Sequence, residues 1–193
     1  SEAVAELRAE GTEGLDEVVG SEGEENQILT EDIIYVTDCQ VETVEEALLP
    51  DAYVGNAAEK LRLYRLIDNM TSDEEVARFA AEVTDRFGQM PRQVLSLLDV
   101  VRLRRRCMLL GVEKVKVKNG LMLLSFPADQ QSAYYKSALF MGVLRHTTRH
   151  PDRYLLRQSS SRLGLTVRGI AGLEEGWKMI DTMLAAARTE AAD

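Results

Sequence analysis

Residues 81–91 constrain the fold more than any other stretch, because they end one helix and begin another within a few positions. Upstream, Ser72 and Glu75 have the spacing of a capping box, in which the serine hydroxyl accepts from the Glu75 amide and the Glu75 side chain reaches back to the amide of Ser72. Gly88 supplies the left-handed residue that ends a helix, and Pro91 suits the first position of the next one. The sequence therefore predicts two consecutive helices joined by a tight corner.

Between these signals the apolar residues recur at three- and four-residue steps, as a helix with one buried face requires. Glu82, Asp85 and Arg86 stand at positions i, i+3 and i+4 of the same helix, so their side chains share one face. One interpretation is a solvated helix end with a Glu82–Arg86 pair that contributes about 0.3–0.5 kcal/mol. The other is a docking surface, because an arginine fork suits a partner's carboxylate and two carboxylates suit a partner's arginines. The apolar positions are Val76, Phe79, Ala80, Val83 and Phe87.

An ordered set of motifs around this corner resembles the C-terminal domain of the bacterial transcription-repair coupling factor family. Taken alone, the Asp-Arg-Phe-Gly corner is a weak signal, but several motifs in the family's order are specific. The resemblance covers about residues 30–190. The motifs are Leu49 to Val54, Leu61 to Leu66, Asp85 to Gly88 followed by Pro91, and Leu103 to Gly111.

The resemblance implies a parent protein that is a multidomain, ATP-driven DNA translocase, which displaces stalled RNA polymerase and recruits nucleotide excision repair. The last domain of that family carries no motor motif. It docks on the N-terminal module that is similar to the B component of the excision-repair nuclease, and covers the surface that would bind the A component. The resemblance therefore implies a non-catalytic, autoinhibitory domain without a cofactor or small-molecule substrate. Its direct partner would be the N-terminal module of the same chain, with the excision-repair A component, RNA polymerase and DNA reached through the parent.

We accordingly predict that Glu82, Asp85 and Arg86 form an interdomain interface. In the resting parent this face would pair with opposite charges on the N-terminal module. Engagement of RNA polymerase and DNA by the motor would then favour the released state. Such a population shift needs differential contacts worth only a few kcal/mol.

Charge is distributed unevenly along the 193 residues, although the formal net charge is −9. Residues 1–50 hold 15 acids and one base, whereas residues 51–193 hold 22 bases and 17 acids. The predicted organisation is the end of a preceding helix of the parent chain at 1–10, an acidic flexible linker at 11–28, and a single α+β C-terminal regulatory domain at 29–193.

The expected fold is α+β, with antiparallel strands from two hairpins packed against several helices and preceded by an acidic flexible flank. Asn119 and Gly120 form a favoured two-residue hairpin turn between two alternating runs. Short runs between Leu29 and Val44, including Ile33–Val36 and Gln40–Thr43, predict one or two strands. Helices are expected at 57–69, 72–87, 92–110, 129–144 and 173–188, and a second hairpin pairs 153–158 with 162–167.

A cluster of arginines crowds the end of the helix predicted at 92–110, and two interpretations stay open. Cations complement the negative end of a helix dipole. Clustered arginines also attract the phosphates of DNA, and this would make the chain a basic accessory domain. The residues concerned are Arg102, Arg104, Arg105 and Arg106.

No pattern for chemistry or metal binding is evident in the sequence. Cys39 and Cys107 lie far apart and predict reduced, partly buried thiols. His146 and His150 have a zinc-ligand spacing, but Pro151 follows at once and no third ligand is near, so they are interpreted as part of a polar connection.

An enzyme would need Glu82 and Asp85 to act as acid and base. Arg86 would keep both carboxylates ionised, which argues against that role. There is also no Gly-rich phosphate loop, no apolar run near the ~20 residues of a membrane span and no signal-peptide pattern. A cytoplasmic, non-enzymatic domain is expected.

Overall fold

The computed structural model describes residues 33–192. The chain divides into two units, and all the described helices and strands belong to the second, which begins at Tyr35. The segments predicted at 1–10 and 11–28 lie outside the described residues. The elements are β1 Gln40–Thr43, α2 Ala57–Asp68, α3 Asp73–Phe87, α4 Arg92–Leu110, β2 Lys114–Lys118, β3 Leu121–Ser125, the 3-10 helix η1 Ala133–Lys136, α5 Ala138–Arg149, β4 Tyr154–Gln158, β5 Leu163–Arg168 and α6 Leu173–Ala192.

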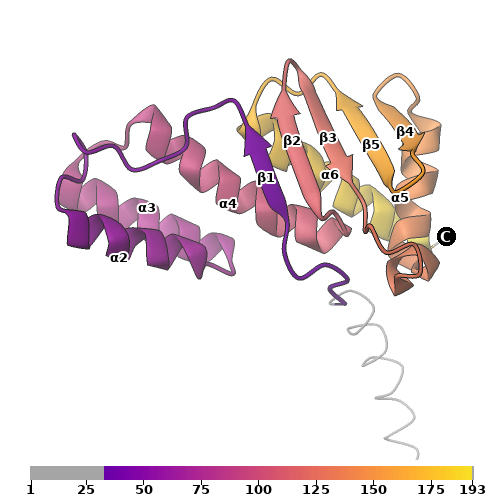
Figure 1. The fold of residues 1–193 in the computed structure, drawn as a ribbon, viewed down its shortest axis with the longest axis horizontal. Coiled ribbons are helices and arrows are strands. Elements are labelled where there is room, and N and C mark those ends of the chain that lie inside the picture. Colours follow the sequence, from indigo (N-terminus) through magenta and orange to yellow (C-terminus); the bar gives the residue numbers. More distant parts are fainter. Residues whose placement is uncertain (1–32, 193) are drawn as a thin grey trace, which may run out of the picture. The chain divides into compact units, whose positions relative to one another are not determined.

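The strands form one five-stranded sheet in the order β1-β2-β3-β5-β4, with helices along one of its faces (Figure 1). Asn119 and Gly120 have φ angles of 53° and 75°, as a tight hairpin turn between β2 and β3 requires. The second hairpin, β4 and β5, joins the first through antiparallel pairing of β3 with β5, with Leu123 opposite Thr166. This confirms the α+β fold with two hairpins packed against helices. The edge strand β1 pairs parallel to β2, which local alternation does not predict.

The two ends of α3 follow from the residues around them. The Ser72 hydroxyl accepts a hydrogen bond from the Glu75 amide at 3.2 Å, which confirms the predicted cap. The Glu75 carboxylate accepts from the amide of Thr71 at 3.1 Å and not from the amide of Ser72. The return hydrogen bond of the predicted capping box is therefore made one residue earlier. Gly88 ends the helix with a φ of +89°. Pro91 precedes the first residue of α4 as its cap, one position earlier than predicted.

Helix α4 is shared by two hydrophobic clusters and is the spine of the domain. Val94 and Leu98 in its first half pack with α2, α3 and the loop at 49–54. Leu103 and Cys107 in its second half pack with the sheet, α5 and α6. We call the first group of elements the helical part and the second the sheet part.

One strand is present where one or two were predicted between Leu29 and Val44. It is Gln40–Thr43, which has β2 as a partner, whereas Ile33–Val36 forms no strand. Two other local predictions were wrong. A single helix at 129–144 is replaced by η1 and α5. The hydroxyl of the buried Tyr134 donates to the Leu110 carbonyl at 2.8 Å and holds η1 in place.

Ser137 separates η1 from α5 because its hydroxyl accepts from the Phe140 amide at 3.1 Å and so caps α5. His146 therefore lies inside α5 and not in a polar connection. Its ring is buried, with Nε2 3.0 Å from the hydroxyl of Tyr154. The histidine spacing thus reflects packing of α5 against β4.

Candidate interaction surface

The corner that ends α3 is held in place by a tyrosine from the preceding loop. The Tyr53 hydroxyl lies 3.0 Å from the Val83 carbonyl oxygen and 2.8 Å from the Gly88 carbonyl oxygen, so its one proton can be donated to either and links the loop to the end of α3. The Tyr53 ring packs against Phe87, with 5.7 Å between centroids, and burial raises the pKa of its hydroxyl. Two of the motifs noted in the sequence therefore meet here and fix the backbone of the corner.

Glu82 and Arg86 belong to a charge network that joins α3 to α2. Arg62 Nη2 lies 2.7 Å from Glu59 Oε1 and 3.1 Å from Glu82 Oε1. Arg86 pairs with Glu59 and lies 3.5 Å from Glu82. Hydrogen bonds from Arg62 and then Arg86 lower the pKa of Glu59 to about 2. We call these four residues the α2–α3 charge network.

The predicted trio is only partly brought together. Asp85 is exposed and has no ion-pair partner among residues 33–192. Arg86 also lies over the Phe87 ring, 4.8 Å from its centroid. Glu59 and Arg62 were not predicted as part of this surface, although their i, i+3 spacing is a detectable signal for a pair on one helix.

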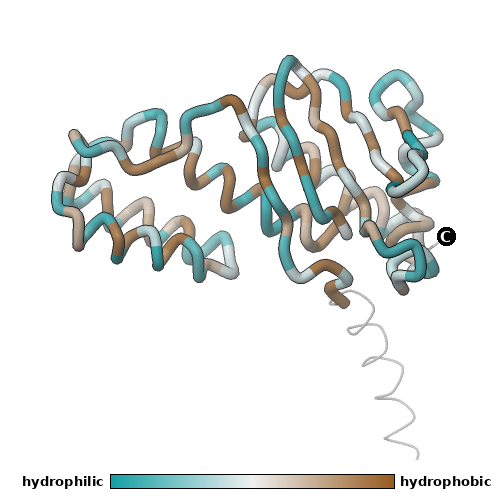
Figure 2. The backbone as a smooth tube through the Cα atoms, in the orientation of Figure 1, coloured by the Kyte–Doolittle hydropathy of each residue, from teal (hydrophilic) through white to brown (hydrophobic). Residues whose placement is uncertain are grey.

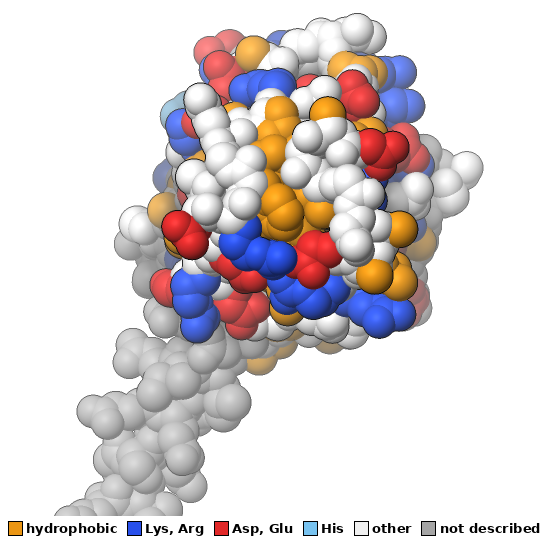
Figure 3. Space-filling model, turned by 90° about the vertical axis from the view of Figure 1, so that its left-hand side faces the viewer, with side chains coloured by type: hydrophobic (Ala, Val, Ile, Leu, Met, Phe, Trp, Pro, Cys, Tyr) orange, Lys and Arg blue, Asp and Glu red, His pale blue; other side chains and the backbone are white. Residues whose placement is uncertain are grey.

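A groove between α2 and α3 adjoins the network. It has a volume of 320 Å³ and is lined by the apolar Leu66, Met70 and Phe79 together with charged residues, of which Glu82 also belongs to the network. Leu66 is 40% exposed. Figure 3, which views the molecule from the left-hand side of Figure 1, shows acidic and basic side chains lying beside one another near a strip of hydrophobic side chains. This mixture is typical of a protein-binding surface more than of a nucleic-acid surface.

The arginines of α4 contact carboxylates within the domain. Arg106 is buried and lies 2.8 Å from both Asp73 on α3 and Asp181 on α6, with its guanidinium 4.5 Å from the centre of the Trp177 ring. Burial alone would raise the pKa of Asp73, but the hydrogen bond and charge of Arg106 outweigh it and lower that pKa. Arg106 therefore connects the helical part to the sheet part.

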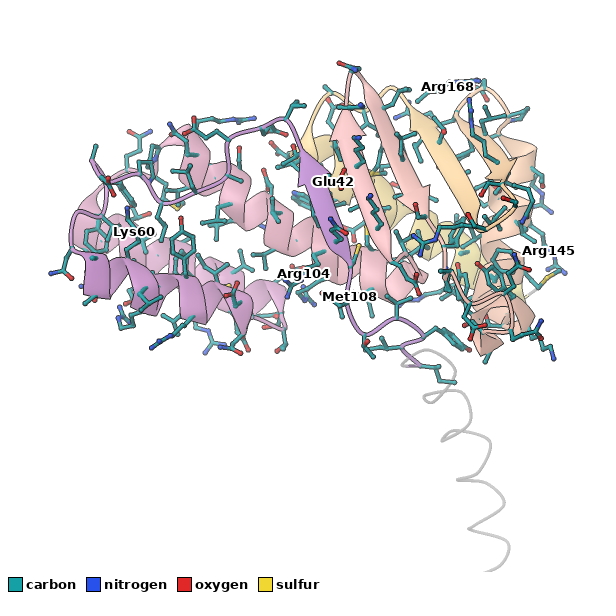
Figure 4. The ribbon with its side chains drawn as sticks, viewed as in Figure 1. Glu42, Lys60, Arg104, Met108, Arg145 and Arg168 are labelled. Carbon is teal, nitrogen blue, oxygen red and sulfur yellow. The ribbon has the colours of Figure 1, made fainter. Side chains whose placement is uncertain are left out.

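The other three arginines are also paired. Arg102 lies 3.2 Å from Asp99, and the same carboxylate accepts from the Trp177 indole at 2.9 Å. Arg105 lies 2.9 Å from Asp73. Arg104, labelled in Figure 4, lies 3.9 Å from Asp38. DNA contact through these four arginines stays a prediction. Because each is paired with an aspartate, less positive charge is available to DNA than the sequence alone indicates.

Comparison with known proteins identifies the family of the domain. The family model described as the TRCF domain matches residues 44–137. A transcription-repair-coupling factor from Rickettsia prowazekii is 32% identical over 117 residues, which are 59% of this chain and 10% of the relative. The Escherichia coli factor is 27% identical over 111 residues, or 58% of this chain and 9% of the relative. A crystal structure of the C-terminal domain of transcription-repair coupling factor superposes with a TM-score of 0.60 at 18% identity, covering 79% of this chain and 97% of that one.

The chain carries the C-terminal domain of a transcription-repair coupling factor. It spans about a tenth of the length of these curated relatives. The matched region runs from just after β1 to Ser137, so it includes the charge network, the corner and the whole of α4. The solved domain of similar fold covers 79% of the chain, a larger share than the family model matches.

The two cysteines of this transcription-repair coupling factor domain lie in its core. Cys39 and Cys107 are free and buried in the same hydrophobic cluster, although 67 residues of sequence separate them. Burial raises the pKa of the Cys107 thiol.

Residues 33–192 contain no group of three or more histidine, cysteine, aspartate or glutamate side chains placed to hold a metal ion. None of the helices in this range is long and apolar enough to cross a membrane.

Proposed function

We propose that this domain is a non-catalytic regulatory element that docks, through the surface around Glu82, Asp85 and Arg86, on the N-terminal module of its parent chain. The module is expected to resemble the excision-repair B component, and docking would mask its surface for the A component. The parent would be an ATP-dependent DNA translocase that removes stalled RNA polymerase and recruits repair. Family membership supports this assignment. The observation that supports this surface as the docking site is the exposed Asp85 carboxylate, which has no ion-pair partner within residues 33–192.

The charges on this surface suit a reversible interface. The α2–α3 charge network contains two acids and two arginines, so Asp85 leaves the surface with one uncompensated negative charge among the described residues. The 3.5 Å contact between Glu82 and Arg86 is long, and both side chains are about two-fifths exposed. Pairs of this kind contribute little by themselves, so a partner can exchange with them at small cost. Desolvation by the partner would strengthen the new pairs.

The backbone under the surface is already ordered. Tyr53 can donate to either of two carbonyls at the end of α3, so docking does not require the corner to fold. A preorganised surface loses less conformational entropy on binding. The groove beside Glu82 offers room for an apolar side chain of the partner next to the charges. Together these features support a docking role over that of a simple solvated helix end.

Calorimetric titration of the chain against the isolated N-terminal module tests the proposal. We expect binding that weakens between low and moderate salt and is lost in the variant Asp85→Lys/Arg86→Glu. In the full-length parent, the same charge reversal extended to Glu82→Lys should release the surface for the excision-repair A component while this domain stays folded.

Asp68→Lys is the matched control, because it reverses an exposed charge near the other end of α2. It should leave binding unchanged. Unaltered binding of the Asp85→Lys/Arg86→Glu variant, with an intact circular dichroism spectrum, would refute the assignment of this surface. Unaltered repair-partner binding by the full-length triple variant would refute autoinhibition.

A further inference from the structure

One face of the sheet is uncovered by the described helices. Helices α4, α5 and α6 lie along the opposite face, as Figure 1 shows. On β2, Val115 and Val117 are buried toward those helices, so the alternating Lys114, Lys116 and Lys118 occupy the uncovered face. We call this surface the open face.

Positive charge dominates the open face. The pairing register adds Arg168 of β5 and Arg157 of β4 to the three lysines. Among the described residues of this face Glu42 is the single acid, and it lies 3.2 Å from Lys114 and 3.7 Å from Lys116. Figure 4 labels Glu42 on the edge strand and Arg168 near the end of β5.

The positive charge is incompletely compensated. Lys118 has no carboxylate within 4 Å among the residues that the structure describes, and the neighbouring Lys116 ammonium lowers the pKa of Lys118. Like charges that repel one another in this way are relieved by an anionic ligand. The open face thus differs from α4, where each arginine of the cluster at 102–106 is paired with an aspartate.

An apolar row runs directly beside the lysines. Leu121 lies opposite Lys118, and Leu123 opposite Lys116, in neighbouring strands about 4.8 Å apart. Successive lysines on one face of a strand are about 6.6 Å apart. Figure 2 shows the hydrophobic β3 next to the more hydrophilic β2. The face therefore offers a row of cations and a parallel row of half-buried leucine side chains.

We propose that the open face binds single-stranded nucleic acid independently of sequence. Its phosphates would follow the lysines of β2, and its bases would lie over Leu121 and Leu123 of β3. A single strand exposes both charged phosphates and apolar base faces, whereas a duplex hides the base faces in its stack. Strands β2 and β3 contain none of the aromatic residues that give strong base stacking, so binding is weak and mainly electrostatic. This site is separate from the docking surface on α2 and α3.

Fluorescence anisotropy with the whole chain and a labelled oligothymidylate strand tests the proposal. For single strands the logarithm of the binding constant falls with the logarithm of salt concentration with a slope of about −0.7 per neutralised phosphate. Three lysine contacts predict a slope of about −2, or a loss of roughly 20-fold between 50 and 200 mM salt. The variant Lys116→Gln/Lys118→Gln should reduce this slope to about −0.7.

Two further variants make the test specific. Arg65→Gln/Lys178→Gln removes the same number of exposed cations from α2 and α6, and should leave the slope unchanged. Glu42→Gln frees Lys114 and Lys116 from their carboxylate, and should tighten binding several-fold. A weaker or unchanged affinity for Glu42→Gln would contradict the assignment.

Competitors distinguish the occupant. A duplex of equal length should compete less well than the single strand, and so should an acidic peptide with the sequence of residues 1–32. Equal or better competition by the duplex would overturn the role given to the leucines. Equal or better competition by the peptide would overturn nucleic acid as the ligand and indicate an acidic polypeptide instead. Equal slopes for the wild type and Lys116→Gln/Lys118→Gln would overturn the site itself.

Discussion

The helical part and the sheet part of this domain differ in how much apolar surface each buries. Among the described residues, the core of the helical part contains ten buried hydrophobic side chains, whereas that of the sheet part contains twenty-two. The helical part carries the mixed-charge surface proposed for docking, and the sheet part carries the basic open face. Regions with fewer buried apolar contacts unfold locally at a lower free-energy cost, and elements that bind partners or move often lie in such regions. The comparison therefore suggests a stable sheet scaffold that supports a less stable docking element.

Truncation of a core leucine in each part should have the largest effect and test this comparison most directly. Leu63 on α2 and Leu124 on β3 are both fully or almost fully buried. Each substitution to alanine should cost about 2–5 kcal/mol, because it removes transfer free energy and leaves a cavity. Amide hydrogen exchange should show lost protection in α2 and α3 for Leu63→Ala while β3 stays protected, and loss throughout the domain for Leu124→Ala. Uniform loss of protection in both variants would mean that the two parts unfold as one unit.

Removal of Arg106 should have the next largest effect, because this side chain connects the two parts. Arg106→Met should lower the free energy of unfolding by about 2–3 kcal/mol, since it leaves Asp181 without its ion-pair partner and Asp73 with Arg105 alone. Both carboxylates are about half exposed, which keeps the cost below that of a fully buried pair. Urea denaturation measures the change, and the transition should broaden if the two parts become uncoupled.

Arg106→Lys is the control for that variant. Lysine keeps the charge but cannot hold two carboxylates with one planar fork, so an intermediate stability is expected. Wild-type stability of Arg106→Met would show that the two parts are held together by apolar packing along α4 alone.

The pH dependence of stability should reveal the Asp73 contact with a smaller effect. The pKa of Asp73 in the folded state is lowered, so its contribution is present above the unfolded pKa of about 3.9 and is lost as the pH falls through the folded value. Asp73→Asn should therefore be less stable than the wild type at pH 7 by about 0.5–1 kcal/mol, a value limited by its exposure. The difference should shrink below pH 4 in denaturation curves recorded from pH 2 to 7. A difference that is constant over this range would exclude the ion pair as its cause.

The smallest expected effect concerns the α2–α3 charge network. Carbon-detected NMR titration should give Glu59 a pKa of about 2, because Arg62 and Arg86 donate to its carboxylate. Arg62→Gln should raise that pKa while changing stability little, since exposed pairs contribute little. Glu174 on α6, whose pKa is lowered by its hydrogen bond with Lys178, provides the control and should be unaffected. An ordinary pKa for Glu59 in the wild type would show that the network is not formed in solution.

Much of the secondary structure could be predicted because its signals are local. The Ser72 cap, the positive φ angles of Gly88 and Gly111, and the hairpin turn at Asn119 and Gly120 each depend on neighbours within about four residues. Such short-range preferences act in any chain context that does not oppose them. The Glu82–Arg86 pair was predictable for the same reason, because one turn of α3 separates its members.

Tertiary structure alone decided the features that depend on distant residues. Periodicity gives no information on which strands pair, so the parallel contact of β1 with β2 and the joining of the hairpins through β3 and β5 could not be read from local patterns. It also could not show that Arg106 is buried between α3 and α6 or that Cys39 and Cys107 share one hydrophobic cluster. The sequence by itself determined the two ends of α3 and the hairpin turn at Asn119 and Gly120. Packing determined which charges are used inside the domain and which, on Asp85 and the open face, remain available to partners.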